Sequence, residues 1–200
     1  MTRTLTEVIK RWPSEEARVW VKDFTVLACA DPDILAVVVF GSTVRSSDYC
    51  ADVDLLVIYD RQKMAVRRHP VDVDIRWHAR SQVERLISEG HELLGWVLKF
   101  GELICEHNGY WTQLREAWLG RMPFPSAVAA DQRAERAERL HTELTEMGDF
   151  DAAHEQRLVA LTQRARAHLI RKGIFPASRP ELPHQLVGSP KVGPVVMVVR

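Results

Sequence analysis

The stretch AVVVFGSTVRSSDYCADVDLLVIYD, residues 36–60, decides the fold because it holds two short apolar runs in close succession. Residues 35–40 and 54–59 are both continuous, apolar and rich in β-branched side chains. Runs of this length and composition are typical of buried strands. The sequence therefore predicts two adjacent buried strands, joined by a polar connection.

Polar residues or glycine lie where each of these two runs meets the connection between them. Gly41 and Ser42 follow the first run, and Asp52 and Asp54 open the second. Side chains two apart on a strand point to the same side, so we expect the two carboxylates to lie together. Such a pair repels itself unless a cation lies between its members, and Mg²⁺ prefers oxygen ligands of this kind. Glycine lets a backbone approach a ligand closely, so Gly41 and Ser42 are candidates to hold phosphate oxygens, with Arg45 just beyond.

A third strand is predicted over residues 71–77, where apolar and polar residues alternate. It carries Asp72 and Asp74 on a common face, so one of them can join the first two carboxylates if the strands pair. Three carboxylates permit a two-metal arrangement for phosphoryl transfer. The third would also accept the proton of an attacking hydroxyl.

The rest of the chain is predicted to be mainly helical. Helical spacing of apolar residues occurs over 4–30, interrupted at Pro13 and Ser14, and again over 81–98. Residues 100–104 are expected to add a short strand or a turn. The fold class is therefore α/β (α+β), with a small mixed sheet flanked by helices.

Three regions are predicted along the chain. Residues 1–122 form the α/β domain, and residues 123–175 form a C-terminal helical hairpin of two antiparallel helices. Residues 176–200 contain repeated prolines and are expected to be largely irregular.

The composition indicates a globular protein with no membrane-spanning segment. Lys plus Arg and Asp plus Glu each total 27, so there is no overall basic excess of the kind that marks nucleic-acid binding. The three cysteines are scattered and odd in number, which argues against a disulfide framework or a thiolate zinc site. We therefore expect a cytoplasmic protein.

The arrangement of these residues resembles the DNA polymerase β-like nucleotidyltransferase superfamily. The matching features are an apolar strand, Gly41-Ser42, nine intervening residues, Asp52-Val53-Asp54 and a later strand that carries Asp74. The short spacing is similar to that of the minimal nucleotidyltransferases of bacteria and archaea, which include antitoxin adenylyltransferases. The match covers residues 30–80. One departure is Ala51, where the family commonly has Ser before the first Asp.

The resemblance implies a Mg²⁺-dependent (or Mn²⁺-dependent) transferase that moves a nucleoside monophosphate, with AMP favoured, from an NTP such as ATP to a hydroxyl. Asp52, Asp54 and Asp74 would be the catalytic and metal-binding residues, with Asp72 as the alternate third carboxylate. Gly41, Ser42 and Arg45 would bind the nucleotide.

The acceptor is not determined by these residues. Three classes of acceptor remain open. A protein such as a cognate toxin predicts a stable complex, a tRNA end predicts salt-sensitive RNA binding, and a small molecule predicts an enclosed cleft. The rival interpretation is an inactive module of the same fold that binds a nucleotide or a partner.

Overall fold

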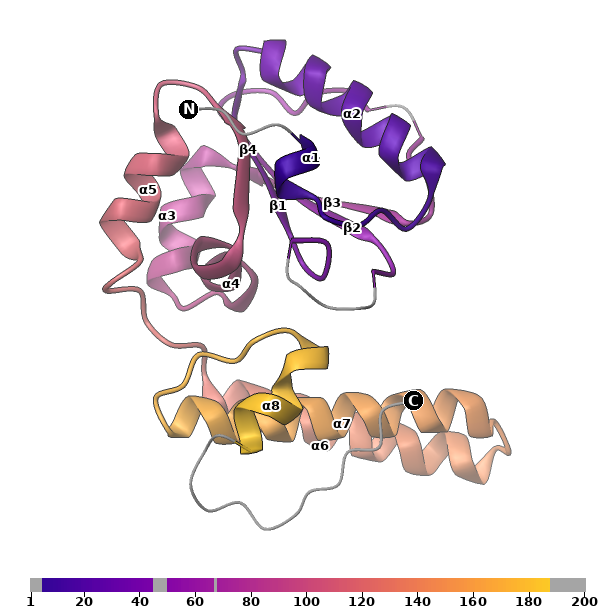
Figure 1. Ribbon diagram of the computed structural model, residues 1–200. Helices are drawn as coiled ribbons and strands as arrows, with labels where there is room; N and C mark the ends of the chain where they lie inside the picture. The colour runs from indigo at the N-terminus through magenta and orange to yellow at the C-terminus, as the bar shows by residue number, and fades with distance from the viewer. Residues whose placement is uncertain (1–4, 45–49, 67, 188–200) are drawn as a thin grey trace. The chain divides into compact units, whose positions relative to one another are not determined.

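A four-stranded sheet with strand order β3-β2-β1-β4 forms the centre of the N-terminal unit in the computed structural model (Figure 1). The strands are β1 (Ile34–Phe40), β2 (Val53–Tyr59), β3 (Val73–Ala79) and β4 (Glu102–Glu106). β1 pairs antiparallel with both β2 and β4, whereas β2 and β3 run parallel. The structure describes residues 5–44, 50–66 and 68–187. The mixed α/β fold class and the strands predicted over 35–40 and 54–59 are confirmed, whereas the strand predicted over 71–77 begins and ends two residues later, as Val73–Ala79.

Helices cover both faces of this sheet (Figure 1). One face lies under α1 (Leu5–Val8) and α2 (Glu15–Ala30), and the other lies under α3 (Arg80–Ser88) and α4 (Glu92–Phe100). A further helix, α5 (Tyr110–Trp118), follows β4. The predicted helical segment over 81–98 is two helices, because Gly90 adopts a φ of +73° and the His91 side chain caps the start of α4.

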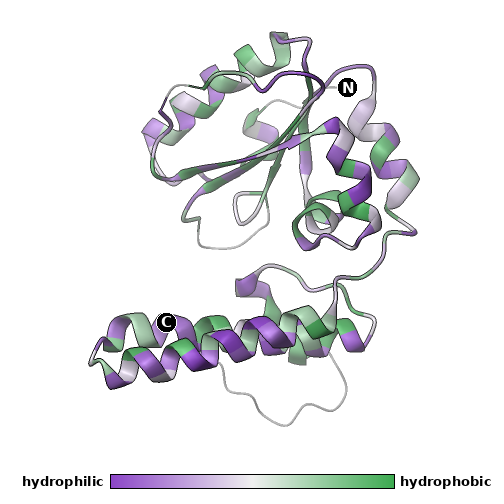
Figure 2. Cartoon of the chain, turned by 180° about the vertical axis from the view of Figure 1, so that it is seen from behind, coloured by the Kyte–Doolittle hydropathy of each residue, from purple (hydrophilic) through white to green (hydrophobic). Residues whose placement is uncertain are grey.

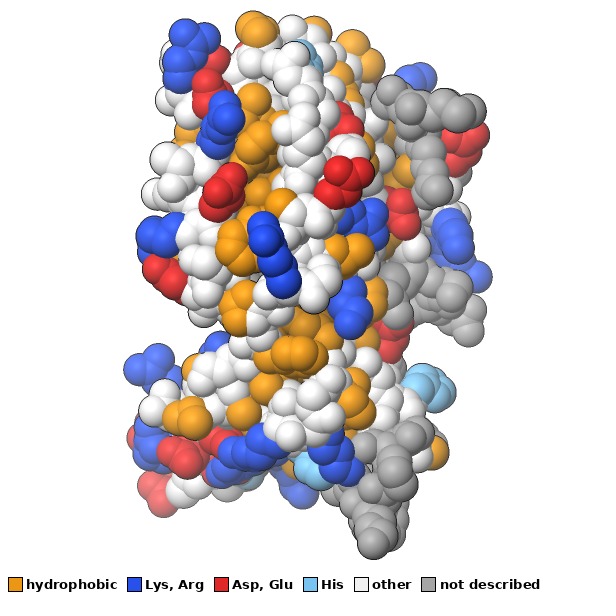
Figure 3. All heavy atoms as spheres, turned by 90° about the vertical axis from the view of Figure 1, so that its left-hand side faces the viewer, with side chains coloured by type: hydrophobic (Ala, Val, Ile, Leu, Met, Phe, Trp, Pro, Cys, Tyr) orange, Lys and Arg blue, Asp and Glu red, His pale blue; other side chains and the backbone are white. Residues whose placement is uncertain are grey.

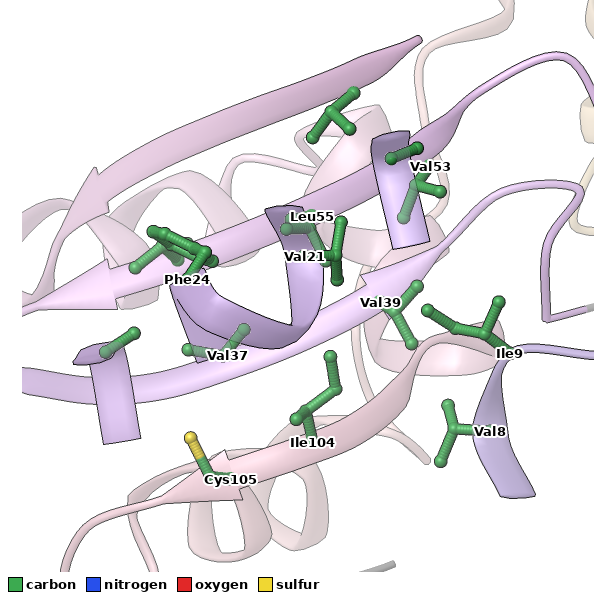
Figure 4. Close-up of a cluster of buried hydrophobic side chains, with 14 of the residues drawn as sticks. Val8, Ile9, Val21, Phe24, Val37, Val39, Val53, Leu55, Ile104 and Cys105 are labelled. Carbon is green, nitrogen blue, oxygen red and sulfur yellow. The ribbon is translucent and has the colours of Figure 1, made fainter. Parts of the chain in front are cut away.

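The main core lies between α2 and the sheet (Figure 4). Val21 and Phe24 of α2 pack onto a row of side chains from neighbouring strands, which includes Val37, Val39 and Leu55. No residue of β1 is more than 7% exposed, because helices cover the sheet on both sides. This explains why its sequence is continuously apolar rather than alternating.

A disulfide between Cys29 and Cys105 joins α2 to β4, with 6.0 Å between the two Cα atoms. The expectation of no disulfide is therefore wrong for these two cysteines, and Cys50 is the free one. The two residues are 76 positions apart in the sequence. They meet only because α2 packs across the sheet, and cysteine spacing cannot reveal that.

The C-terminal unit, Phe124–Arg200, is based on a helical hairpin of α6 (Ala127–Glu146) and α7 (Phe150–Arg171). Ser126 and Asp149 cap the two helices through their side-chain oxygens. The buried positions of both helices are mainly alanines, and charged side chains such as Arg164 pair across the outside of the hairpin. Figure 2 shows this mixture of hydrophilic and hydrophobic residues along both helices. No described helix is long and apolar enough to cross a bilayer.

The predicted irregular tail is wrong for residues 179–187. They form a 3₁₀ turn, η1 (Arg179–Glu181), and a short helix, α8 (Leu182–Val187). The prolines fit because the first turn of a helix tolerates a residue without an N–H group. Leu182 is fully buried and packs in a small cluster with Leu169 of α7. Residues 188–200 lie outside the described residues.

Candidate functional site

The parallel pairing of β2 and β3 brings two of the predicted carboxylates side by side. Asp54 is the register partner of Asp74, just as Val53 is the partner of Val73. Neighbouring strands lie about 4.8 Å apart, so two carboxylates at paired positions share one small region of the sheet face. This face is opposite the one on which Val53 and Leu55 enter the main core.

The turn after β1 packs directly against Asp54. Phe40, the last residue of β1, is paired with Asp54, so Gly41 follows beside that side chain. Gly41 has a φ of +82°, and a Cβ atom built there would lie only 2.1 Å from Asp54 Oδ2. A larger residue would be strained in its backbone and would overlap the carboxylate. Glycine is therefore required at position 41 for two independent reasons, the positive φ and the space that the Asp54 carboxylate occupies.

Burial and mutual repulsion destabilise the charged forms of the carboxylates. Burial is the main cause that raises the pKa of Asp54 to about 7, followed by the charges of Asp52 and Asp74, while Arg76 opposes the shift. The pKa of Asp52 is also raised, first by burial and then by Asp74 and, to a smaller extent, Asp72. Like charges held together in this way attract a cation.

Both candidates for the third carboxylate lie close to the pair. Asp74 forms an ion pair with Arg76 on its own strand, with 2.5 Å between Oδ2 and Nη2. Asp72 precedes β3, and its backbone carbonyl accepts a hydrogen bond from the Val53 N–H at 2.9 Å. Asp74 is the one in register with Asp54.

The polar residues after Gly41 continue the same turn. Ser42 follows it directly and is half-buried. Thr43 is 1% exposed, and its hydroxyl donates to the Phe40 carbonyl at 3.1 Å. This bond closes the turn on itself, a role that the sequence analysis missed although the Gly-Ser-Thr run makes a hydroxyl-bonded turn a reasonable hypothesis. Arg45 lies outside the described residues.

Cys50 is a second residue that the sequence analysis did not place at the site. Its thiol lies 3.6 Å from the backbone carbonyls of Arg11 and Asp52. Burial raises its pKa, and the charges of Asp52 and Asp54 raise it further. The thiol is therefore held neutral and is a poor nucleophile at neutral pH.

The carboxylates fit a hard divalent cation by their chemistry. Within the described parts of the chain, no group of three His, Cys, Asp or Glu side chains is arranged as a ready metal site. Mg²⁺ usually takes only one or two protein carboxylates, and water and substrate phosphates complete its octahedron. Asp52 and Asp54 offer such a pair, with repulsion that a cation relieves.

Of three comparisons with known proteins, the one with solved structures found a similar protein. No protein-family model matches the sequence, and no curated protein matches it either. Among solved structures, a nucleotidyltransferase-like protein from Exiguobacterium sibiricum 255-15 is similar, with a TM-score of 0.39 and 18% sequence identity. The match covers 89% of this chain and 68% of that protein. A likeness at this level does not extend to activity or substrate.

Proposed function

We propose that this protein is a metal-dependent nucleotidyltransferase. The observation that carries the proposal is the position of Asp54, which lies between the Gly41 turn and the carboxylate of Asp74. A tight glycine turn beside clustered carboxylates places backbone N–H groups for phosphate oxygens next to ligands for a divalent cation. A nucleoside triphosphate bound with a divalent cation needs both.

The residues of the site take separate roles in this proposal. Asp52 and Asp54 would hold Mg²⁺ (or Mn²⁺), and the bound ion would neutralise charge on the phosphates and lower the pKa of an attacking hydroxyl. The backbone of Gly41 and the Ser42 hydroxyl bind the triphosphate. Asp74 accepts the proton of the acceptor hydroxyl.

The reaction transfers a nucleoside monophosphate, with AMP from ATP as the favoured case. The hydroxyl oxygen of the acceptor forms a bond to the α-phosphorus, and the bond from that phosphorus to the bridging oxygen breaks. Pyrophosphate leaves with the electron pair, and the hydroxyl proton passes to Asp74. Catalysis of this kind depends mainly on positioning and on charge stabilisation, for which a rigid sheet edge is suited.

The acceptor is a protein, an RNA end or a small molecule. The net charge of the chain is zero, and on the face shown in Figure 3 the Lys and Arg side chains are interspersed with Asp and Glu. RNA binding usually uses a clustered basic surface. The zero net charge of the chain therefore favours a protein or small-molecule acceptor over RNA.

The test is transfer of label from each of four α-labelled NTPs, with and without Mg²⁺, to purified protein and to a cell lysate. Wild type is compared with the Asp52→Ala/Asp54→Ala double variant. Metal-dependent labelling that the double variant abolishes would support the proposal, and the size of the labelled product would identify the acceptor class. A wild-type protein that neither labels any acceptor nor binds a Mg-NTP complex would refute it.

The alternative function is an inactive module that binds a nucleotide or a partner protein. Two observations favour it: Ala51 provides no hydroxyl beside Asp52, and Asp74 is paired with Arg76. This alternative predicts binding of Mg-NTP with no release of pyrophosphate when the lysate is supplied as a source of acceptors.

A further inference from the structure

Arg76 lies on the same sheet face as the carboxylates of the proposed site. It is two residues after Asp74 on β3, and its register partner is Leu56 of β2. Two residues of strand span roughly 7 Å, so the Arg76 backbone lies one step further from the glycine turn than Asp74 does. Its guanidinium nevertheless contacts Asp74 Oδ2 and therefore reaches back toward the site.

The ion pair between Arg76 and Asp74 is accessible to solvent. The two side chains are 55% and 39% exposed. Ion pairs that water can reach are weak, because water screens the attraction and two long side chains lose freedom. The pair can therefore be exchanged for another partner without disturbing the fold.

A guanidinium is well suited to phosphate, since its planar array of N–H donors matches two phosphate oxygens at once. We propose that Arg76 is a nucleotide-binding residue that pairs with Asp74 in the free protein and moves to the triphosphate when Mg-NTP binds. This inference rests on the proposed function and adds a binding residue and an order of events to it. The move releases Asp74 for the acceptor hydroxyl only when the substrate is in place.

The exchange couples the two ligands of the site. While Arg76 holds Asp74, the positive guanidinium opposes a divalent cation at the neighbouring carboxylates. Once a triphosphate takes the guanidinium, that opposition is removed. Nucleotide and metal should therefore each raise the affinity for the other, and this coupling must be reciprocal.

The test measures binding rather than activity, with Arg76→Gln, Arg76→Lys and a matched control. The control is Arg85→Gln, because Arg85 of α3 forms a similar exposed ion pair, at 2.8 Å, with Glu89, the residue that follows this helix. Calorimetry measures the affinity for the Mg²⁺ complex of α,β-methylene-ATP, a non-cleavable analogue. Electron paramagnetic resonance measures Mn²⁺ binding without nucleotide, and circular dichroism confirms that each variant is folded.

We expect Arg76→Gln to weaken analogue binding at least tenfold and to tighten Mn²⁺ binding several-fold, with Arg76→Lys between it and wild type. Arg85→Gln should match wild type in both measurements. If wild type binds the analogue and Arg76→Gln binds it within twofold, the role of Arg76 is refuted and the proposed function stands. If wild type binds neither the analogue nor Mn²⁺, both the role of Arg76 and the proposed function are refuted.

Discussion

The Asp54→Asn variant should be more stable than wild type in alkaline buffer while losing the proposed transferase activity. Asparagine has the same size as aspartate and fits beside Gly41, but it carries no charge. In wild type without metal, burial and the charges of Asp52 and Asp74 disfavour the ionised carboxylate and raise the pKa of Asp54 to about 7. The substitution removes this unfavourable ionisation together with one of the two proposed metal ligands.

The magnitude follows from the difference between the folded and unfolded pKa of Asp54. The unfolded value is near 3.8 and the folded value is about 7, so the folded state binds the proton more tightly. The stability from this group is fully present below pH ~4 and is lost as the pH rises through ~7. At about 1.4 kcal/mol per pH unit, roughly 3 kcal/mol is lost between pH 5 and pH 7. Because Asp52 and Asp74 share in the shift, we expect about 1.5–3 kcal/mol to be recovered by the single substitution.

The assay is urea unfolding of both proteins at pH 5 and pH 8, in buffer with a metal chelator. The advantage of Asp54→Asn in unfolding free energy should grow by the stated amount between the two pH values. Asp23→Asn, at an exposed position on α2, should show no such growth. Adding Mg²⁺ at pH 8 should stabilise wild type more than Asp54→Asn. An advantage that does not change with pH would refute the account of a destabilising carboxylate cluster.

Three further variants test other parts of the structure. Gly41→Ala should abolish the proposed transferase activity and lower the unfolding free energy by about 2–4 kcal/mol in urea. Gly148→Ala, with a similar φ of +81° and no atom within 4 Å of the added Cβ, should lower it by only about 1 kcal/mol. Equal losses would show that overlap with the site carboxylate is unimportant. Replacing both cysteines of the Cys29–Cys105 pair by serine should lower the unfolding free energy by up to ~4 kcal/mol, as expected for a loop of 76 residues. Unchanged stability, with no loss on adding dithiothreitol to wild type, would contradict a disulfide. Leu169→Ala, at a fully buried position, should destabilise the C-terminal unit by about 2–5 kcal/mol and expose α8 to proteolysis, and an unchanged digestion pattern would contradict the packing of α8.

Local sequence signals were sufficient for the strands and for the residues that surround Asp54. A buried strand needs a continuous apolar run, and the runs that form β1 and β2 are recognisable without any tertiary information. The side-chain period of a strand then places Asp52 and Asp54 on one side. The proximity of Asp74 required one further assumption, that β3 pairs with β2, and the parallel register meets that condition.

Features that depend on packing between distant segments could not be predicted in this way. The Cys29–Cys105 disulfide depends on how α2 lies across the sheet. The burial of Leu182 against Leu169 depends on the chain turning back after α7, which the prolines in that segment concealed. The contact between Arg76 and Asp74 depends on side-chain direction, because Arg76 could equally have pointed into solvent.

The carboxylate cluster is itself an argument for function, because the fold does not need it. The strands are held by apolar side chains such as Val53 and Leu55, and these would pack equally well beside asparagine or serine. Structural carboxylates usually have partners that lower their pKa, whereas burial and like charges raise the pKa of both Asp52 and Asp54. A position that keeps a destabilising charge when a neutral residue would fit is typical of sites where binding of a ligand relieves the charge. Under the proposed function this ligand is a divalent cation bound together with a nucleotide, and the proposal therefore predicts that the pH dependence of Asp54→Asn and its loss of activity appear together.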